Sequence, residues 1–181
     1  MKCIGIDPGK NGAIVTLEGP HIVFKGVTPL IGNELDMHGL SELIRSQTGE
    51  DCHVFVEKVH AIHGSSAGAT FTFGGVYYAV QAILCTLHQP FTLVQPKEWQ
   101  KVMYQGIPEI RKAPIVIKKG KRSGQTIKGR VDTKAMSLLA AKRLYPSEDL
   151  RKNERSRIEH DGIVDALLIA AYGQRKLCGG F

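Results

Sequence analysis

Residues 158–172 read IEHDGIVDALLIAAY. Their apolar spacing predicts an α-helix that carries Asp161 and Asp165 one turn apart on the same face. Because that face continues through Leu168 and Tyr172, it is the face that the helix buries. An unpaired carboxylate there would cost on the order of several kcal/mol of folding free energy, or would take up a proton.

Two explanations account for these acids. A divalent cation shared with other carboxylates would offset their negative charge. Alternatively, both acids lie near the start of the helix because the positive end of the helix dipole favours them there. The helix by itself does not separate the two explanations, so the choice depends on the rest of the chain.

The length and composition predict one globular domain spanning residues 1–181. Of the 181 residues, 43% are hydrophobic and 23% are charged, as in ordinary soluble proteins. The chain has no run of 18 apolar residues, so we expect no membrane-spanning segment. A strand pattern begins at once with MKCIGI, which leaves no room for a signal or transit peptide. We therefore expect a protein that is not secreted.

The four cysteines lie far apart and form neither a C-x-x-C pair nor a zinc-ligand pattern. They are Cys3, Cys52, Cys85 and Cys178. This usage predicts reduced thiols and a reducing, cytoplasmic compartment.

The charge is basic and unevenly distributed. Lysine and arginine total 24 against 17 acids, which gives a net charge of +7 and favours a polyanionic partner, nucleic acid first. Residues 111–130 hold eight of the basic residues and no acid. Within this stretch, residues 115–118 and 125–128 are β-formers that flank a turn-like GKRSG, so we expect an inserted basic hairpin at about 111–130.

The order of the remaining elements predicts an α/β fold. Alternation and turn residues predict three successive antiparallel strands, and helical and strand patterns then alternate. We expect a mixed sheet with helices on both faces. The expected strands are 2–7, 13–18, 21–25, 53–57 and 91–94, and the expected helices before the last one are 36–47, 73–87, 96–102 and 131–144.

Two further acids end apolar strands. Asp7 lies where the first strand meets the turn DPGKNG, and its side chain shares a face with Cys3 and Gly5, which are small and leave room above it. Glu57 ends a middle strand. With Asp161 and Asp165, these acids form an oxygen-rich set that suits Mg²⁺ or Mn²⁺ rather than zinc. Two such ions about 4 Å apart activate a water and stabilise the leaving oxygen of a phosphodiester.

The chain carries IGIDPG at 4–9, VEKV at 56–59 and DGIVDALLIA at 161–170. Together and in this order, these motifs resemble the RuvC family of Holliday-junction resolvases. The resemblance covers most of the chain and is greatest to the phage branch, which is also similar to the plant chloroplast resolvase. It implies an RNase H-like fold, a homodimer, two Mg²⁺ or Mn²⁺ ions per active site, and the host cytoplasm if the protein is phage-encoded. It also implies paired symmetric nicks in a four-way DNA junction that leave 5′-phosphate and 3′-hydroxyl ends.

The resemblance assigns the acids by position. Asp7, Glu57 and Asp165 match three family acids, whereas bacterial RuvC members place the fourth acid three residues before the last, where this chain has Gly162. Asp161 can still face the site from one turn away. His160 is the alternative fourth ligand, but we favour Asp161 because His160 lies toward the adjacent helical face.

Basic residues of the resembling segments are expected to contact DNA or to assist the reaction. Lys134, in RVDTK, matches a family lysine that can stabilise developing phosphorane charge, and Lys101 lies in WQKVMYQG, which resembles a family segment bearing a basic residue. Both can also be ordinary solvated helix lysines. The expected DNA contacts are Lys10, Lys58, His60, Lys101, Lys118, Lys119, Lys121, Arg122, Lys128 and Arg130.

The family places an aromatic wedge three residues after the glutamate, where this chain has His60. His60 can stack on a base or be solvated, and Phe71 or Phe73 is an alternative apolar wedge, although we expect Phe73 in the core. The resemblance also suggests dimerisation through the apolar helix 73–87.

Three other functions compete with junction cleavage. An RNase H-type nuclease would cut other branched DNA or an RNA–DNA hybrid, and a noncatalytic junction-binding protein would show no Mg²⁺-dependent nicking. A sugar-kinase or actin-like ATPase would use the GIDPG turn as a phosphate loop, but those folds need two such domains, which 181 residues do not supply.

Overall fold

A computed structural model describes residues 1–59, 66–116 and 124–179 and contains a mixed five-stranded sheet. β1 (Lys2–Asp7), β2 (Ala13–Glu18) and β3 (His21–Val27) form an antiparallel meander. β6 (Cys52–Glu57) pairs with β1 in parallel, and β7 (Phe91–Val94) pairs with β6 in parallel. The order β3-β2-β1-β6-β7 confirms the predicted sheet. β4 (Leu30–Ile31) and β5 (Glu34–Leu35) form a separate short hairpin.

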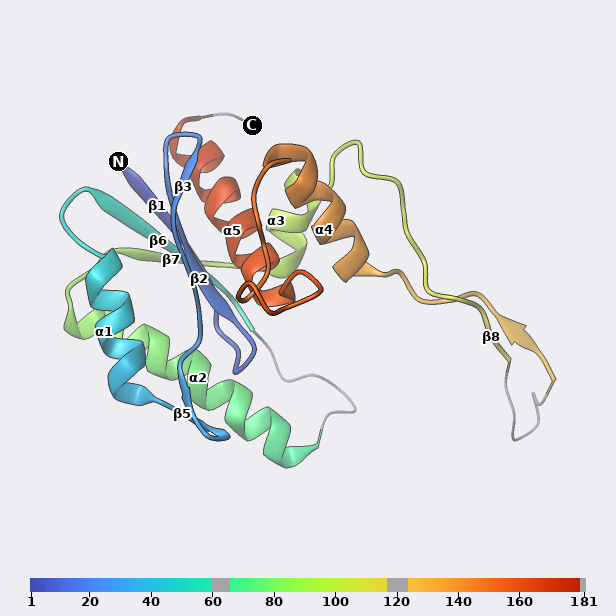
Figure 1. The fold of residues 1–181 in the computed structure, drawn as a ribbon, viewed down its shortest axis with the longest axis horizontal. Coiled ribbons are helices and arrows are strands. Elements are labelled where there is room, and N and C mark those ends of the chain that lie inside the picture. The colour runs from blue at the N-terminus through green and yellow to red at the C-terminus, as the bar shows by residue number, and fades with distance from the viewer. Residues whose placement is uncertain (60–65, 117–123, 180–181) are drawn as a thin grey trace.

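Helices cover both faces of the sheet, as predicted (Figure 1). α1 (Met37–Gln47) and α2 (Ala67–Thr86) lie on one face. α3 (Pro96–Met103), α4 (Thr133–Leu144) and α5 (Asp161–Leu177) lie on the other.

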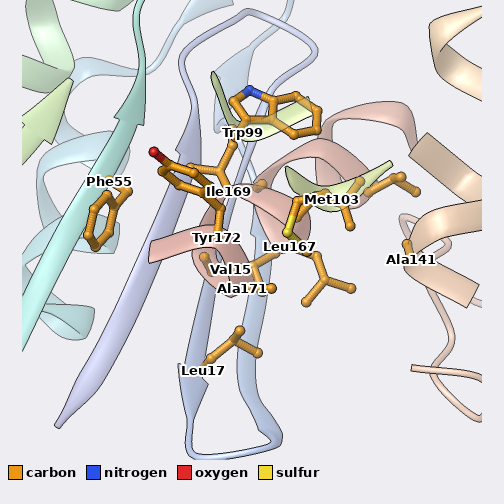
Figure 2. Packing of buried hydrophobic residues seen from close by; sticks show 14 of the residues in the cluster. Val15, Leu17, Phe55, Trp99, Met103, Ala141, Leu167, Ile169, Ala171 and Tyr172 are labelled. Atoms are coloured by element: carbon orange, nitrogen blue, oxygen red, sulfur yellow. The ribbon is translucent and has the colours of Figure 1, made fainter. Parts of the chain in front are cut away.

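Strand alternation divides the core into two apolar layers. Ile4 and Ile6 of β1 face α1 and α2, whereas Cys3 faces α5. On the α5 side, Trp99 packs with residues of α5 such as Leu167 and Tyr172 (Figure 2). The alternation that places Cys3 on this side also places Asp7 there, so the first acid lies on the α5 face.

α5 rests directly on β1 because Gly5 has no side chain. A Cβ atom at Gly5 would overlap the carbonyl oxygen of Ala166 and the backbone nitrogen of Ala170. The room that the small residues beside Asp7 leave is therefore taken by the backbone of α5. The close approach brings the buried side of α5 against the end of β1.

Three helices begin two or more residues away from their predicted starts, each at a polar cap. α5 starts at Asp161 and not at Ile158, because His160 caps it by accepting from the amide of Ile163. α4 starts at Thr133 and not at 131, because Asp132 accepts from the amide of Ala135 at 3.2 Å. α2 starts at Ala67 behind the cap Ser66, six residues before the predicted start at Phe73.

The insertion forms an arm that extends away from the body beyond α4 (Figure 1). β8 (Ile115–Val116) pairs with β9 (Thr126–Ile127) in antiparallel fashion, which confirms the hairpin, and β9 is shorter than the predicted strand 125–128. At its base, the backbone amide of Lys112 donates to the carbonyl of Arg130 at 2.9 Å, and the guanidinium of Arg111 donates to the carbonyl of Gly129 at 3.1 Å. The predictions for Lys118, Lys119, Lys121 and Arg122 lie outside the described residues.

All four cysteines carry free thiols. Within the described ranges, no helix combines the length and the apolar character that crossing a membrane requires.

Candidate active site

Asp7 and Glu57 end neighbouring parallel strands on the α5 face of the sheet. The last paired residues of β1 and β6 are Ile6 and Val56, so the two acids lie side by side one residue further on. Glu57 accepts a hydrogen bond from the indole nitrogen of Trp99, with 2.9 Å between Nε1 and Oε1. The sequence prediction that these two acids meet is therefore consistent with the sheet register.

The last helix brings the other two acids to the same end of the sheet. Asp165 is partly buried, whereas the Asp161 side chain is 56% exposed and forms an ion pair with Lys134 of α4. A cavity of about 540 Å³ opens here. Its lining includes Asp7, Lys10, Lys134, Asp161 and Asp165, together with Gly9, Asn11, Gly12, Gly68, Ala69, Thr72, Phe73 and Gly162.

The pKa values of the carboxylates reflect their burial and their mutual repulsion. Burial raises the pKa of Asp7 well above its ordinary value, and the charges of Glu57, Asp165 and Asp161 raise it further. Burial also raises the pKa of Glu57 to about 7, which the Trp99 hydrogen bond partly offsets. The pKa of Asp165 rises to about 6, again mainly through burial. Ionisation of all these acids together is therefore unfavourable unless a positive charge lies beside them.

A cation is the natural complement to this charge. Lys134 supplies one positive charge, and its pKa is raised chiefly by its hydrogen bond to Asp161. Carboxylate oxygens on rigid elements are the donors that Mg²⁺ and Mn²⁺ prefer. The donor chemistry and the uncompensated charge therefore fit divalent ions. As the side chains stand, however, no three acidic, histidine or cysteine groups of the described chain converge closely enough to ligate one ion.

Gly162 occupies the position where bacterial RuvC members have an acid because it packs against the β1–β2 turn. A Cβ atom there would overlap the carbonyl oxygen of Asn11 and the backbone of Gly12. No side chain fits at this position, so an acid on this turn of the helix has to stand at another residue. Asp161 lines the cavity, whereas the ring of His160 serves as the helix cap.

The predicted DNA-contact residues fall into different places. Lys10 lines the cavity and donates to the side chain of Asn33 at 3.3 Å. Lys58 is partly buried, and its backbone amide continues the β6–β7 pairing by donating to Val94. The remaining described residues are all exposed: Lys101 on α3, and Lys128 and Arg130 on the returning strand of the arm. His60 lies outside the described residues.

Phe73 is not a core residue. It lines the cavity, and a Cβ atom at Gly9 would lie 3.6 Å from its ring. Phe71, two residues earlier on α2, is 84% exposed. The preference for Phe73 in the core was wrong because α2 begins six residues earlier than predicted and carries this ring to the edge of the site.

Sequence reasoning missed two residues that hydrogen-bond to the acids and a third that bonds to one of those two. Trp99 donates to Glu57, and Ser137 forms a side-chain hydrogen bond to Asp165. The hydroxyl of Tyr104 lies 2.6 Å from that of Ser137. One signal was available, since Trp99 is the single tryptophan of the chain and a buried indole N–H needs an acceptor. Ser137 and Tyr104 give no comparable signal.

Comparisons with known proteins find similarity in structure and not in sequence. Neither models of protein families nor curated protein sequences give a match to this chain. Two solved structures of RuvC from Thermus thermophilus do match, and one of them is a complex with a Holliday junction substrate. That complex has a TM-score of 0.57 at 14% identity, covering 99% of this chain and 98% of the RuvC chain. The second has a TM-score of 0.56 at 17% identity, with the same coverage. The chain therefore has the RuvC-like form of the RNase H-like fold.

Proposed function

We propose that this protein is a metal-dependent endonuclease that resolves four-way DNA junctions by paired symmetric nicks. The observation that carries the proposal is the group of carboxylates from β1, β6 and α5, whose pKa values are raised by burial and by one another beside a cavity and a lysine. Strongly shifted carboxylates in a cleft are typical of catalytic sites. The similarity to RuvC in fold supports the choice of a branched DNA substrate.

In the proposed site, Asp7, Glu57, Asp161 and Asp165 hold two Mg²⁺ or Mn²⁺ ions. Such ions supply an activated water and charge stabilisation for the leaving oxygen, which leaves 5′-phosphate and 3′-hydroxyl ends. Asp7 and Glu57 are fixed by the strand ends, and Asp165 by the helix that rests on Gly5. Ligands on rigid elements keep their geometry without an ordering cost at the moment of reaction.

Lys134 supports the same reaction from α4. Its ammonium lies at the cavity beside Asp161, where it can stabilise the charge that develops on the phosphorane oxygens. Its contact with Asp161 also holds it on the side of the cavity that the scissile phosphate would enter.

The four acids Asp7, Glu57, Asp161 and Asp165 form what we call the acidic centre. The residues that we propose to hold the junction lie outside it. Lys10 at the cavity rim and the basic residues of the arm would contact phosphates, which position the DNA without reading its sequence. A four-way junction is two-fold symmetric, so paired nicks need two copies of the site. We propose a homodimer, with exposed aromatic residues of α2 such as Tyr78, 69% exposed, at the contact.

The test is cleavage of a synthetic four-way junction labelled on each strand in turn, with Mg²⁺ and with EDTA. We expect Mg²⁺-dependent nicks at symmetric positions in two opposing strands. Flap, duplex and RNA–DNA hybrid substrates of the same sequence serve as controls. Preferred cleavage of the hybrid would replace the proposal by an RNase H-type activity, and junction binding without nicking would leave only a junction-binding protein.

A further inference from the structure

We propose that α3 and the residue that ends it position the acidic centre: Trp99 orients Glu57, and Tyr104 orients Asp165 through Ser137. The inference rests on the proposed function, because it concerns how two of the proposed metal ligands are held. These three residues touch no substrate, so they are positioning residues and not catalytic ones.

Trp99 reaches Glu57 from the apolar core. The indole is 1% exposed and packs in the apolar layer between the sheet and α5 (Figure 2). Its Nε1 donates to Oε1 of Glu57 at 2.9 Å. This bond uses one of the two carboxylate oxygens, and it fixes the direction of the other. A buried aromatic ring that cannot turn is a rigid donor for this purpose.

Tyr104 reaches Asp165 through a chain of two hydroxyl groups. Its hydroxyl oxygen lies 2.6 Å from the hydroxyl of Ser137, which is 3% exposed and bonds to Asp165. A carboxylate that ligates a cation is ionised and only accepts, so Ser137 donates to Asp165. Ser137 then accepts from Tyr104 at 2.6 Å, because its single proton is already used, and the Tyr104 hydroxyl also lies 3.2 Å from the backbone carbonyl oxygen of Thr133, a second acceptor. The tyrosine thereby sets the direction in which the serine proton points.

The two contacts belong to one packed unit. The rings of Trp99 and Tyr104 meet edge to face, with centroids 5.9 Å apart and an interplanar angle of 82°. Pro96 at the start of α3 and the capping box of Gln95 and Glu98 fix the helix that carries the indole. A short helix of eight residues thus contacts a ligand on β6 and, through α4, a ligand on α5.

Groups that hydrogen-bond metal ligands set the orientation of those ligands. Removal of such a group commonly weakens metal affinity by about 10- to 100-fold. Tyr104→Phe and Ser137→Ala each remove hydroxyl groups of the Asp165 chain, and Trp99→Phe removes the indole N–H. We expect each variant to bind Mn²⁺ about 10-fold more weakly than the unaltered chain.

Isothermal titration with Mn²⁺ measures this affinity without any cleavage. Tyr145→Phe is the matched control, because Tyr145 is a partly buried tyrosine at the edge of the same apolar cluster and ends α4 away from the acids. Its affinity should equal that of the unaltered protein. Thermal melting in EDTA, compared between Tyr104→Phe and Tyr145→Phe, checks that the folded state is equally populated.

Trp99 also supplies a spectroscopic signal, because it is the single tryptophan of the chain. Metal binding at Glu57 withdraws charge from the acceptor of the indole N–H, so we expect the tryptophan emission to change on titration with Mg²⁺. The midpoint of that change should move to about 10-fold higher Mg²⁺ in Tyr104→Phe and in Ser137→Ala, and should stay in place in Tyr145→Phe.

The outcomes separate this inference from the proposed function. If the unaltered chain binds neither Mn²⁺ nor Mg²⁺, the metal-dependent nuclease is wrong and the inference falls with it. If the unaltered chain binds metal and Tyr104→Phe and Ser137→Ala bind it equally well, only the inference is overturned. Weaker binding in these two variants with the Tyr145→Phe control unchanged supports it.

Discussion

The acidic centre and the basic arm are built in opposite ways. The centre is assembled from strand ends and a helix that pack against the core, and its carboxylates are held by neighbours such as Trp99. In the described part of the arm, Val116 is 53% and Ile127 43% exposed, and hydrogen bonds join its two sides at the base. Chemistry requires ligands fixed to within fractions of an ångström, whereas phosphate contacts tolerate movement.

This difference predicts a division of labour. Substitutions in the centre should abolish cleavage and spare binding, and substitutions in the arm should do the reverse. The electrostatics agree with this division, because the centre concentrates negative charge that repels DNA, and residues 111–130 carry eight positive charges and no acid.

The largest effect is expected from Asp7→Asn. Loss of the carboxylate removes a shared ligand at the centre, so junction cleavage should fall by at least about 1,000-fold. Junction affinity, measured by gel shift in EDTA, should stay within about twofold because the arm is intact. Cleavage at the normal rate would remove Asp7 from the mechanism and with it the assignment of the centre.

Lys134→Met should have the next largest effect, a loss of about 100-fold in the single-turnover cleavage rate, because it removes transition-state charge stabilisation. Lys97→Met is the control, since Lys97 is an exposed lysine of α3 that does not line the cavity. Equal rates for the two variants would mean that Lys134 is merely a solvated helix lysine.

Replacement of Lys118, Lys119, Lys121 and Arg122 by alanine should weaken junction binding by about 30-fold at moderate salt and leave the cleavage rate of bound junction unchanged. The slope of log affinity against log salt should become shallower by up to about 0.9 for each charge that faces a phosphate. Arg45→Ala, on α1 across the sheet, is the control and should leave the slope alone. An unchanged slope in the fourfold variant would show that the arm does not hold DNA.

The smallest expected effect is a difference in folding stability between a substitution in the acidic centre and one at the base of the arm. The pKa of Asp165 is raised from 3.8 to about 6 in the folded protein. As the pH rises, the unfolded chain therefore loses the Asp165 proton at a lower pH than the folded protein does. The metal-free protein loses stability between these two pKa values. Asp165→Asn should therefore raise the free energy of unfolding in EDTA by about 3 kcal/mol at pH 8, and the gain should shrink toward zero between pH 6 and pH 4.

Urea denaturation measures this gain. Glu109→Gln, at the base of the arm, removes a carboxylate that is paired with Arg111 at 2.6 Å, and it should give no stabilisation. A gain at pH 8 that persists unchanged at pH 4 would show that the effect does not come from ionisation of Asp165.

The sequence predicted the sheet, the helices and the strand-end positions of Asp7 and Glu57, because alternation and turn chemistry act locally. It did not predict that Phe73 reaches the cavity, since that depends on where the cap Ser66 starts α2. Nor did it reveal the hydrogen bond of Ser137 to Asp165 or that of Tyr104 to Ser137, because residues of α4, of α5 and from the end of α3 meet there only after the chain has folded.

The contact between Gly162 and the turn at Asn11 and Gly12 links two segments that lie far apart in the chain. Any side chain at position 162 would require residues 11 and 12 to withdraw from the start of α5. A change at Gly162 therefore also alters the course of the turn that follows Asp7, so the first strand and the last helix cannot vary independently at this point.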